Sequence, residues 1–584
     1  MRVLIVGGYG VFGGRLARLL ADEQRIQLII AGRSLEKAQA FCGAVLPGAS
    51  CEPVRFDRSG DLKGQLGALK PDVIVDASGP FQAYGDNPYR LVEAAIGLGV
   101  SYLDLADGAD FVEGVAVFDE IAKAAGVFVL SGVSSFPVLT AAVVRALSHD
   151  LDHVDAVEGG IAPSPYAGVG ENVIRAIAAY SGRPVKLRRD GRDGRGYGMA
   201  ESRRYVIRPP GHMPLPGIRF SLVDVPDLRV LPKLWPDLAE VWMGAGPVPE
   251  ILHRMLNGLA LLVRWRILPS LQPFGGLFHK AINIVRWGEH RGGMYVEVRG
   301  RRAGACLVRS WHMIAEGDDG PLIPSMAAEA IIRRALVGAS PENGARSAAA
   351  ELELSDYEAL FGGRAIVTGR REEPALDAAA PLYRRVLGEA YDRLPAPIRA
   401  LHDAAEPMEG LATVERGRNP IGRLAANLFG FPPAGHVPVR VEFIRTTDGG
   451  ELWRRNFGGR SFESHQCEGR GSWAGLITET FGPVTVGLAP IVSPGKLELV
   501  VRRWSIFGVV LPRAWAPRGP AFEHLERGQF AFAVTIAHPL FGRLVAYRGT
   551  LVPSSDSVPD GGLVAGRRTR DLSGDASRAA GLRG

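Results

Sequence analysis

A glycine-rich turn near the start of the chain limits what the first domain can be. Residues 6–17 read VGGYGVFGGRLA and hold five glycines directly after the apolar run Arg2–Val6. Each glycine loses much backbone entropy on folding, so a cluster of them indicates a place where bare main chain is needed. A helical pattern over Val11–Leu20 begins inside the cluster. We therefore expect a strand, a tight turn and a helix in immediate succession.

The spacing of these glycines fits a loop that holds a diphosphate. Gly8-x-Gly10-x-x-Gly13 matches the dinucleotide fingerprint, and Gly7-x-x-Gly10-x-x-Gly13 is a second acceptable register. In such loops an early glycine allows the turn, the middle one lets a pyrophosphate approach the main chain, and the last lets the helix lie close to the strand. The phosphates meet the free N–H groups of the helix N-terminus. The alternative is a glycine turn that binds nothing. The predicted pyrophosphate site comprises Gly7, Gly8, Tyr9, Gly10, Val11, Phe12 and Gly13.

The end of the second strand indicates which dinucleotide binds. Loops that prefer NAD place an acidic residue there for the ribose 2′-hydroxyl, whereas this chain reads IIAGRS, with Arg33 and Ser34. An arginine attracts a 2′-phosphate and can stack on adenine, so we predict NADP(H) as the cofactor. The alternative for Arg33 is a solvated surface arginine. Asp57, after the third strand, is a candidate acceptor for the adenine amino group or, equally, a turn-forming residue.

The first 150 residues alternate β-rich runs with helical patterns, which predicts a Rossmann-type, doubly wound parallel sheet over residues 1–150. Runs such as DVIVDAS are apolar throughout, as in a sheet covered on both faces. The expected strands are 2–6, 27–31, 51–56, 73–76, 101–103 and 127–130, and the expected helices are 11–20, 35–45, 89–98, 115–125 and one after Pro137.

The rest of the chain divides into two further parts and a tail. Residues 151–370 predict a mixed α+β substrate or dimerisation domain, with a returning helix at 324–338 and a linker over 368–380. Residues 381–553 open with a helical stretch and continue as alternating strands, so we expect a mainly antiparallel β domain, either an open sheet or a barrel. The Ser-, Asp-, Gly- and Arg-rich residues 554–584 predict a disordered tail.

Several stretches resemble the saccharopine dehydrogenase-like NADP-binding family. The stretch Gly79-Pro80-Phe81 in VDASGPFQAYG is similar to the family's element after the fourth strand, and Tyr102-Leu103-Asp104 to its Tyr-x-Asp after the fifth. The loop SGVSSFPV departs from the family's Gly-Phe-Asp-x-x-Pro element, because Ser134 stands where an aspartate is usual. The resemblance covers roughly residues 1–370 and implies fold and cofactor; relatives act on imines or as enoyl reductases in lipid synthesis. Residues 381–553 resemble a bacterial domain of unknown function fused behind such reductases.

Catalytic candidates come from the loops after the fourth, fifth and sixth strands. Ligands of doubly wound sheets lie beyond the carboxyl ends of the strands, so we expect residues 78–84, 104–108 and 131–137 near the nicotinamide, with Ser78, Gly79 and Pro80 in contact with the cofactor. Hydride transfer usually needs a proton donor, and the predicted donors are Tyr84, Tyr102 and Asp104. Their alternatives are a packed aromatic side chain for Tyr84 and a loop or helix cap for Asp104.

Composition excludes some partners and leaves others open. The net charge of +6 is spread along the chain, and no basic motif with interleaved aromatics points to nucleic acid. The four cysteines form no Cys-x-x-Cys pair, which argues against a disulfide framework or a metal site and favours a cytoplasmic location. The apolar, basic stretch 251–287 is either a membrane-surface segment at the inner membrane face or a helical subdomain that covers the active site or a homodimer face.

The sequence is compatible with two functions. The first is an NADP-dependent oxidoreductase that passes hydride to a C=C, C=N or C=O bond of a small or lipid-like substrate. The second is a dinucleotide-binding scaffold or partner protein with little turnover, which the loss of the family's loop aspartate favours.

Overall fold

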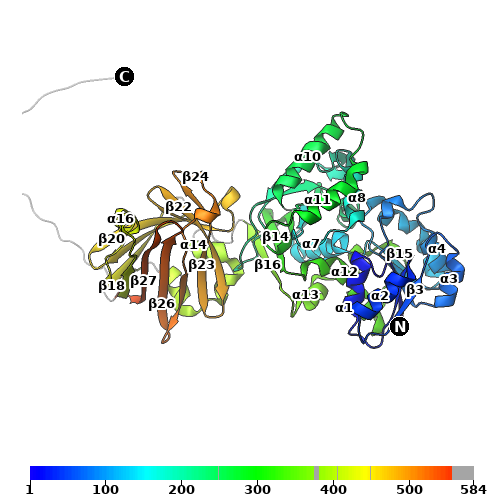
Figure 1. The fold of residues 1–584 in the computed structure, drawn as a ribbon, viewed down its shortest axis with the longest axis horizontal. Helices are drawn as coiled ribbons and strands as arrows, with labels where there is room; N and C mark the ends of the chain where they lie inside the picture. The colour runs from blue at the N-terminus through cyan, green and yellow to red at the C-terminus, as the bar shows by residue number, and fades with distance from the viewer. Residues whose placement is uncertain (248, 374–379, 404–405, 447–448, 555–584) are drawn as a thin grey trace, which may run out of the picture.

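The computed structural model of the chain describes residues 1–247, 249–373, 380–403, 406–446 and 449–554. Figure 1 shows three parts in a row, with the N-terminal domain in blue at one end, a β-barrel in yellow to red at the other, and a mixed α+β part between them. The predicted fold class is thereby confirmed for all three parts. The predicted tail, apart from Ser554, lies outside the described residues.

The first domain is built on a parallel sheet of seven strands, in the order β15-β6-β5-β4-β1-β2-β3. Its central strands are fully buried because helices cover both faces. The six strands predicted from the sequence are confirmed within two residues at their ends. The strands are β1 (Arg2–Val6), β2 (Gln27–Gly32), β3 (Cys51–Arg55), β4 (Val73–Asp76), β5 (Ser101–Asp104), β6 (Phe128–Ser131) and β15 (Gly344–Ser347).

The seventh strand, β15, is not predicted by the sequence, because its four residues GARS carry no β pattern. Tertiary contacts fix it at the edge beside β6: the Gly344 amide donates to the Val127 carbonyl at 2.9 Å, and the Ala345 amide donates to the Asp119 carboxylate at 2.9 Å. The strand therefore comes from a segment about two hundred residues beyond the rest of the sheet, which no local signal reveals.

Two sets of helices cover the first sheet. Residues of α1, α2 and the later helix α12 pack on one face, and residues of α3 and α4 pack on the other. The predicted helix 115–125 is shorter than expected, because residues 115–118 form a 3₁₀ turn before α6; the helix over 62–69 was not predicted. The helices are α1 (Val11–Leu20), α2 (Leu35–Val45), α3 (Leu62–Leu69), α4 (Arg90–Gly97), α5 (Ala109–Gly114) and α6 (Asp119–Ala124).

The middle part contains a mixed sheet in the order β10-β11-β12-β7-β13-β14-β16, in which only β12 and β7 run parallel. The strands of this part are β7 (His153–Ala162), β8 (Pro184–Arg189), β9 (Arg192–Tyr197), β10 (Ser202–Tyr205), β11 (Ile218–Leu222), β12 (Glu240–Ala245), β13 (Arg291–Arg302), β14 (Ala305–Glu316) and β16 (Ile366–Glu373).

The helices of the middle part connect it to the first domain. The predicted returning helix is confirmed as α12, which packs along α1, and its Ser325 hydroxyl donates to the Phe12 carbonyl at 3.1 Å. Among the described residues, no helix is both long and apolar enough to cross a membrane. The helices are α7 (Thr140–Ser148), α8 (Glu171–Tyr180), α9 (Asp227–Leu234), α10 (Glu250–Arg264), α11 (Gly275–Ile284), α12 (Ile323–Leu336) and α13 (Leu354–Phe361).

The linker predicted over residues 368–380 is wrong for its first part. Residues up to Glu373 belong to β16, which pairs antiparallel with β14 from Ala315↔Ile366 to Val308↔Glu373. The charged run GRREE resembles a solvated linker, but here it is an edge strand. Arg371 donates to the carbonyls of Arg208 and Val386, and Glu372 and Glu373 pair with Arg309 and Arg208. Residues 374–379 lie outside the described part of the chain.

The C-terminal part is a closed antiparallel barrel. Its strands follow one another around the sheet, and pairing of β22 with β23 closes the ring. The period-two strand predictions for this part are confirmed. The strands are β17 (Met408–Arg416), β18 (Gly435–Arg445), β19 (Glu451–Phe457), β20 (Arg460–Glu468), β21 (Ile477–Phe481), β22 (Val484–Ser493), β23 (Lys496–Ile506), β24 (Val509–Val510), β25 (Ala521–Glu526), β26 (Gln529–His538) and β27 (Gly542–Pro553).

Helical residues share the barrel's core. Residues of α14 (Leu382–Leu387) and α15 (Ala396–Asp403) form one apolar cluster with inward-facing strand residues such as Phe530 and Phe532. The His402 ring stacks on Tyr383 and contacts the Glu523 carboxylate at 2.7 Å. Side chains of the two helices and of the strands thus pack together inside the barrel.

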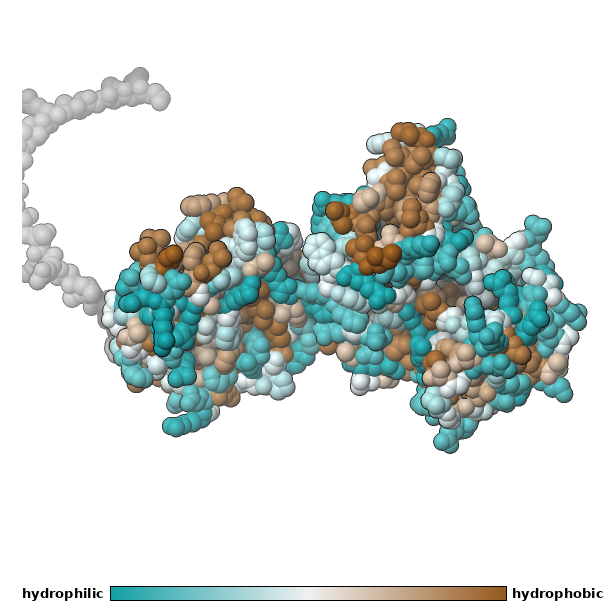
Figure 2. Space-filling view, viewed as in Figure 1, coloured by the Kyte–Doolittle hydropathy of each residue, from teal (hydrophilic) through white to brown (hydrophobic). Residues whose placement is uncertain are grey.

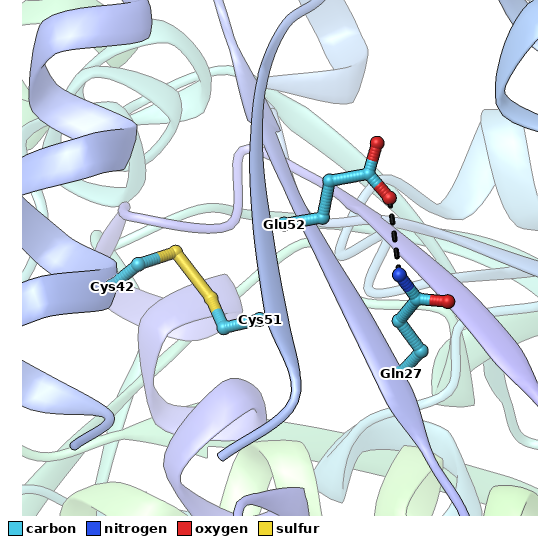
Figure 3. Close-up of a disulfide and its surroundings, with 4 residues drawn as sticks. All are labelled: Gln27, Cys42, Cys51 and Glu52. Atoms are coloured by element: carbon cyan, nitrogen blue, oxygen red, sulfur yellow. Dashed lines mark hydrogen bonds between the residues drawn. A yellow bond between two sulfur atoms is a disulfide. The ribbon is translucent and has the colours of Figure 1, made fainter. Parts of the chain in front are cut away.

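The expectation of no disulfide is wrong for one pair of cysteines. Cys42 near the end of α2 and Cys51 at the start of β3 are bonded to each other, with 6.2 Å between their Cα atoms (Figure 3). Because α2 packs directly on β3, residues nine apart in the sequence come within the range that a disulfide spans. The cysteine pattern therefore carries no argument for a reducing compartment.

Candidate cofactor site

The glycine turn has the backbone geometry of a phosphate loop. After β1, Gly7 adopts a positive φ of 80°, and the amides of Gly7 and Gly8 both donate to the Ala31 carbonyl at 2.9 and 3.1 Å. A Cβ added at Gly13 would lie only 2.4 Å from the Gly7 carbonyl oxygen. The chain therefore uses glycine at these positions because the turn and the first turn of α1 lie against each other without room for a side chain.

The N-terminus of α1 is open to an anion. Gly10 caps the helix without any side-chain hydrogen bond, and the first turn has no acidic residue. The amides of Val11, Phe12 and Gly13 stand in the first turn of the helix, where no intrahelical acceptor exists. Bare amides at the positive end of a helix dipole suit a diphosphate, so this loop fits the predicted dinucleotide.

The end of β2 carries the residues predicted to select the cofactor. Arg33 is exposed and forms no ion pair with any described residue. Tyr9 lies across Gly32, where an added Cβ would be 2.5 Å from its ring, and its hydroxyl accepts from the Ser34 amide at 3.1 Å. The Ser34 hydroxyl caps α2 by accepting from the Lys37 amide. Arg33 and the Ser34 backbone thus stand beside the glycine turn, where a 2′-phosphate of the adenosine would lie.

Asp57 is held in a turn after β3. Its carboxylate accepts from the Ser59 amide at 2.9 Å, and its own amide donates to Gln65 at 2.8 Å. The side chain remains exposed. The turn-forming role left open by the sequence is therefore present in the structure, and the contact with adenine stays a prediction.

A buried carboxylate organises the loop after β4. Asp76, the last residue of β4, is completely buried and forms an ion pair with Arg58 at 3.3 Å between Nε and Oδ2. The hydroxyl of Ser78 donates to Asp76 Oδ1 at 2.6 Å, and its amide donates to the same oxygen at 3.0 Å. This network fixes the backbone of residues 76–80, which includes the predicted contacts Ser78, Gly79 and Pro80.

Tyr84 joins the same network. Its hydroxyl lies 3.2 Å from Asp76 Oδ2 and 2.9 Å from the Ser78 hydroxyl, and the Arg58 guanidinium lies over its ring at 3.2 Å from the centroid. Burial raises the pKa of the Tyr84 phenol, the charge of Asp76 raises it further, and Arg58 opposes both. Tyr84 therefore holds its proton throughout the physiological range, and its side chain is only half buried.

The other two predicted donors lie inside the domain. Tyr102 and Asp104 of β5 are both completely buried. The Tyr102 ring belongs to the core beneath α3 and α4, and its hydroxyl has no partner among the described residues. In this conformation neither side chain reaches a surface from which a bound substrate could take a proton.

Asp104 ties β5 to the loop after β6. Its Oδ1 atom accepts from the amides of Gly132 at 2.8 Å and Ala106 at 3.0 Å and from the Ser131 hydroxyl at 3.0 Å. Burial raises the pKa of Asp104 to about 7, although these hydrogen bonds oppose the rise. The residue therefore positions the loop at the carboxyl ends of β5 and β6.

The raised pKa of Asp104 predicts that the first domain loses stability as pH increases. The folded state binds the proton more tightly than the unfolded chain, so this contribution is complete below about pH 4 and is lost as pH rises through about 7. The full difference is of the order of 4 kcal/mol. We expect Asp104→Asn to flatten this pH dependence in hydrogen exchange of β5 and β6, corrected for intrinsic rates. The variant Asp86→Asn, in an exposed loop, should keep the wild-type slope, and an equally steep slope for Asp104→Asn would refute the assignment.

The middle part of the chain closes one side of the cofactor loops. The Asn172 side chain at the start of α8 donates to the Gly79 carbonyl at 3.0 Å, and Arg15 of α1 donates to the Ala167 carbonyl at 2.8 Å. Gly170 faces Val11, because an added Cβ would lie 3.5 Å from the valine methyl group. Residues 167–172 therefore lie against both the glycine turn and the loop after β4.

Sequence reasoning missed Arg58, Asp76 and Asn172. Asp76 had a usable signal, because a charged residue ends an otherwise apolar strand in DVIVDAS. Arg58 and Asn172 had none, since only the fold brings residues from three separate segments to the same edge of the sheet.

The first domain has a match among known protein families. Residues 3–130 match the model of the saccharopine dehydrogenase NADP binding domain. NADP(H) is thus the cofactor of this domain, and the match supports a dinucleotide-dependent oxidoreductase. Residues 394–551, in the barrel, match a domain of unknown function, DUF4166. No curated protein matches the chain.

Several solved structures are distantly similar. Apo saccharopine dehydrogenase (L-Glu forming) from Saccharomyces cerevisiae is 13% identical, with a TM-score of 0.46 over 63% of this chain and 99% of that chain. Biliverdin reductase from Synechocystis sp. PCC 6803, in complex with biliverdin and NADP⁺, is 12% identical, with a TM-score of 0.28 over 61% and 94%. The WlbA dehydrogenase from Thermus thermophilus, in complex with NAD and α-ketoglutarate, is 12% identical, with a TM-score of 0.28 over 59% and 90%. None of these likenesses bears on the substrate of this chain.

Proposed function

We propose that the protein is an NADPH-dependent oxidoreductase that reduces a C=C, C=N or C=O bond of a small or lipid-like molecule. The observation that carries the proposal is the set of bare amides of Val11, Phe12 and Gly13 at the start of α1, with the unpaired Arg33 beside the glycine turn. Bound NADPH supplies the hydride. The chain's own residues bind its diphosphate through the first turn of α1 and its 2′-phosphate through Arg33.

In this proposal Tyr84 is the residue that holds the proton for the reduced product. It is the one predicted donor that keeps exposed surface, and Ser78 lies within hydrogen-bond distance of its hydroxyl. Asp76 and Arg58 orient the phenol, because one accepts its hydrogen bond and the other covers its ring. Asp104 and Tyr102 are assigned positioning roles, since both lie inside the domain.

A scaffold that binds NADPH with little turnover is the second candidate. The burial of Tyr102 and Asp104 favours it, because it leaves a single exposed donor whose phenol is a weaker acid than usual. Fluorescence titration with NADPH, followed by cofactor oxidation against a panel of enoyl, keto and imine compounds, separates the two functions. Turnover with any of these classes supports the oxidoreductase. Tight binding with no turnover on the whole panel supports the scaffold, and absence of binding refutes both.

The cofactor assignment predicts a selective defect for Arg33→Ala. A charge-assisted contact with a phosphate is typically worth about 1.5–3 kcal/mol, so we expect NADPH binding to weaken by roughly 10- to 100-fold. NADH lacks the 2′-phosphate, so its affinity should change little. Calorimetric titration of both nucleotides measures the difference. Lys37→Ala, an exposed lysine of α2, serves as the control for loss of one positive charge near the site. Equal losses for NADPH and NADH would show that Arg33 does not contact the 2′-phosphate.

A further inference from the structure

Three clusters of exposed apolar side chains protrude from the protein. The hairpin cluster consists of Met255, Trp265, Ile267, Leu277, Ile284 and Trp287 on and around α10 and α11. The helix cluster consists of Ile421, Leu424 and Leu428 of α16 (Pro420–Leu428) with Leu540 of the turn between β26 and β27. The turn cluster consists of Phe507, Val509, Val510 and Trp515 around β24. Such side chains are normally buried, and three groups of them indicate an interaction surface.

The helix α16 shows the feature most clearly. Its small residues Gly422 and Ala426 face the barrel, whereas Ile421, Leu424 and Leu428 point outward at helical spacing. Leu428 is 85% exposed. An amphipathic helix in a globular domain normally turns its large apolar residues toward the core. Here the arrangement is reversed, so the large side chains are available to an external apolar phase.

Apart from Leu540, the residues of each cluster lie in a stretch of sequence that is basic and contains no acidic residue. Residues 251–288 contain Arg254, Arg264, Arg266, Lys280 and Arg286 without any Asp or Glu; residues 416–441 contain four arginines, and residues 499–522 contain four more, again without an acid. In a chain with 62 acidic residues, their absence from all three stretches is informative. Arg264, Arg266, Lys280 and Arg423 form no ion pair with any described residue. The hairpin and helix clusters thus lie beside unpaired positive charge, which makes them complementary to an anionic, partly apolar surface.

The three clusters face the same side of the molecule. In the view of Figure 1, α10, β24 and α16 lie in the upper part of the molecule with α11 just below α10, and Figure 2 shows apolar surface in brown in the upper parts of both lobes. An ionic contact ties the hairpin region to the barrel: the Glu289 carboxylate lies 2.6 Å from Arg502 and 3.2 Å from Arg513, which flank the turn cluster. Burial would raise the pKa of Glu289, but hydrogen bonds from Arg291 and Arg502 lower it to about 2, so the contact persists at neutral pH.

We propose that this side is a docking surface for a membrane leaflet that contains anionic phospholipid. The clusters come from two domains and are separated by polar surface, so a matching partner must be broad and must accept several apolar insertions at once. A bilayer does this, because acyl chains receive the apolar side chains while lipid phosphates pair with the surrounding arginines. Trp265 and Trp287 suit the interface, where an indole ring has both apolar and polar neighbours. The proposal goes beyond the oxidoreductase function and does not depend on it.

The test is flotation of the full chain with vesicles of phosphatidylcholine alone or mixed with phosphatidylglycerol. We expect binding to the anionic vesicles, weaker binding to neutral ones, and loss of binding as salt is raised. Ile284→Ser/Trp287→Ser and Leu424→Ser/Leu428→Ser change exposed residues of two clusters, and each should weaken binding about tenfold or more. Val117→Ser/Val337→Ser changes residues that are equally exposed but lie outside the three clusters, and should bind as the wild type does.

Three outcomes would overturn the proposal. The first is a wild-type chain that floats with neither vesicle. The second is a pair of cluster variants that float as well as the wild type. The third is a wild-type dimer, seen by sedimentation velocity, that the cluster variants dissociate. That result would show that the surface binds a second copy of the chain. Retention of NADPH binding by the cluster variants checks that they remain folded and separates this proposal from the proposed function.

Discussion

Gly13→Ala is expected to abolish measurable NADPH binding and to destabilise the first domain by about 3 kcal/mol. The new methyl group would stand 2.4 Å from the Gly7 carbonyl oxygen and 3.0 Å from the Gly8 Cα atom. Both neighbours are backbone, so no side chain can rotate away to make room. Either α1 moves off the glycine turn or the turn itself opens, and each change displaces the amides that bind the diphosphate.

Calorimetric titration with NADPH and hydrogen exchange of β1 and α1 measure the two effects. Gly43→Ala is the matched control, because Gly43 lies in α2 and an added Cβ would meet nothing within 4 Å. Alanine is the better helix former, so this control should bind NADPH normally and be unchanged or slightly stabilised. A Gly13→Ala variant that binds NADPH like the wild type would disprove the assigned role of the turn.

The first domain was predictable because its local signals agree with its topology. Apolar strand runs, capped helices and the glycine turn each determine a short element, and a parallel sheet follows from their alternation. The predictions for β15 and for the linker region were wrong for the opposite reason. GARS and GRREE have weak or contrary local preferences, and each becomes a strand only because a neighbouring strand edge, β6 or β14, offers its hydrogen bonds.

The candidate site was predictable where it depends on backbone and not where it depends on side chains. The glycine spacing locates the cradle, since only backbone is needed to form it. The network of Arg58, Asp76 and Tyr84 joins residues from two loops, and the sequence holds no information on their distances. Burial was equally hidden: Asp104 was expected in a loop, but it and Tyr102 both belong to the central strand β5, and both are completely buried.

Asp76→Asn is expected to destabilise the loop over residues 77–90 and to weaken NADPH binding. The carboxylate is completely buried and is the ionic partner of Arg58, whose side chain is 21% exposed. Removing one member of a buried pair typically costs about 3–5 kcal/mol, and the partial exposure of Arg58 places the expected loss near the lower value. The new side chain would also turn its NH₂ group toward either the guanidinium or the Ser78 amide, and neither of them can accept a hydrogen bond. The loop that carries Ser78, Gly79 and Pro80 would then lose its fixed geometry.

A double-mutant cycle with Arg58→Met separates the ionic contact from general damage. If the ion pair carries the effect, the double variant should be less destabilised than the sum of the two single variants, by about 1 kcal/mol or more. Hydrogen exchange of peptides over residues 73–90 supplies the free energies. Tyr84→Phe keeps the ring beneath Arg58 and removes one hydroxyl, so it should cost about 1 kcal/mol. Additive single effects, or unchanged protection of the loop in Asp76→Asn, would show that the buried carboxylate does not hold the loop. In that case the loop geometry would have to depend on its outer contacts, of which the Asn172–Gly79 hydrogen bond is the strongest candidate.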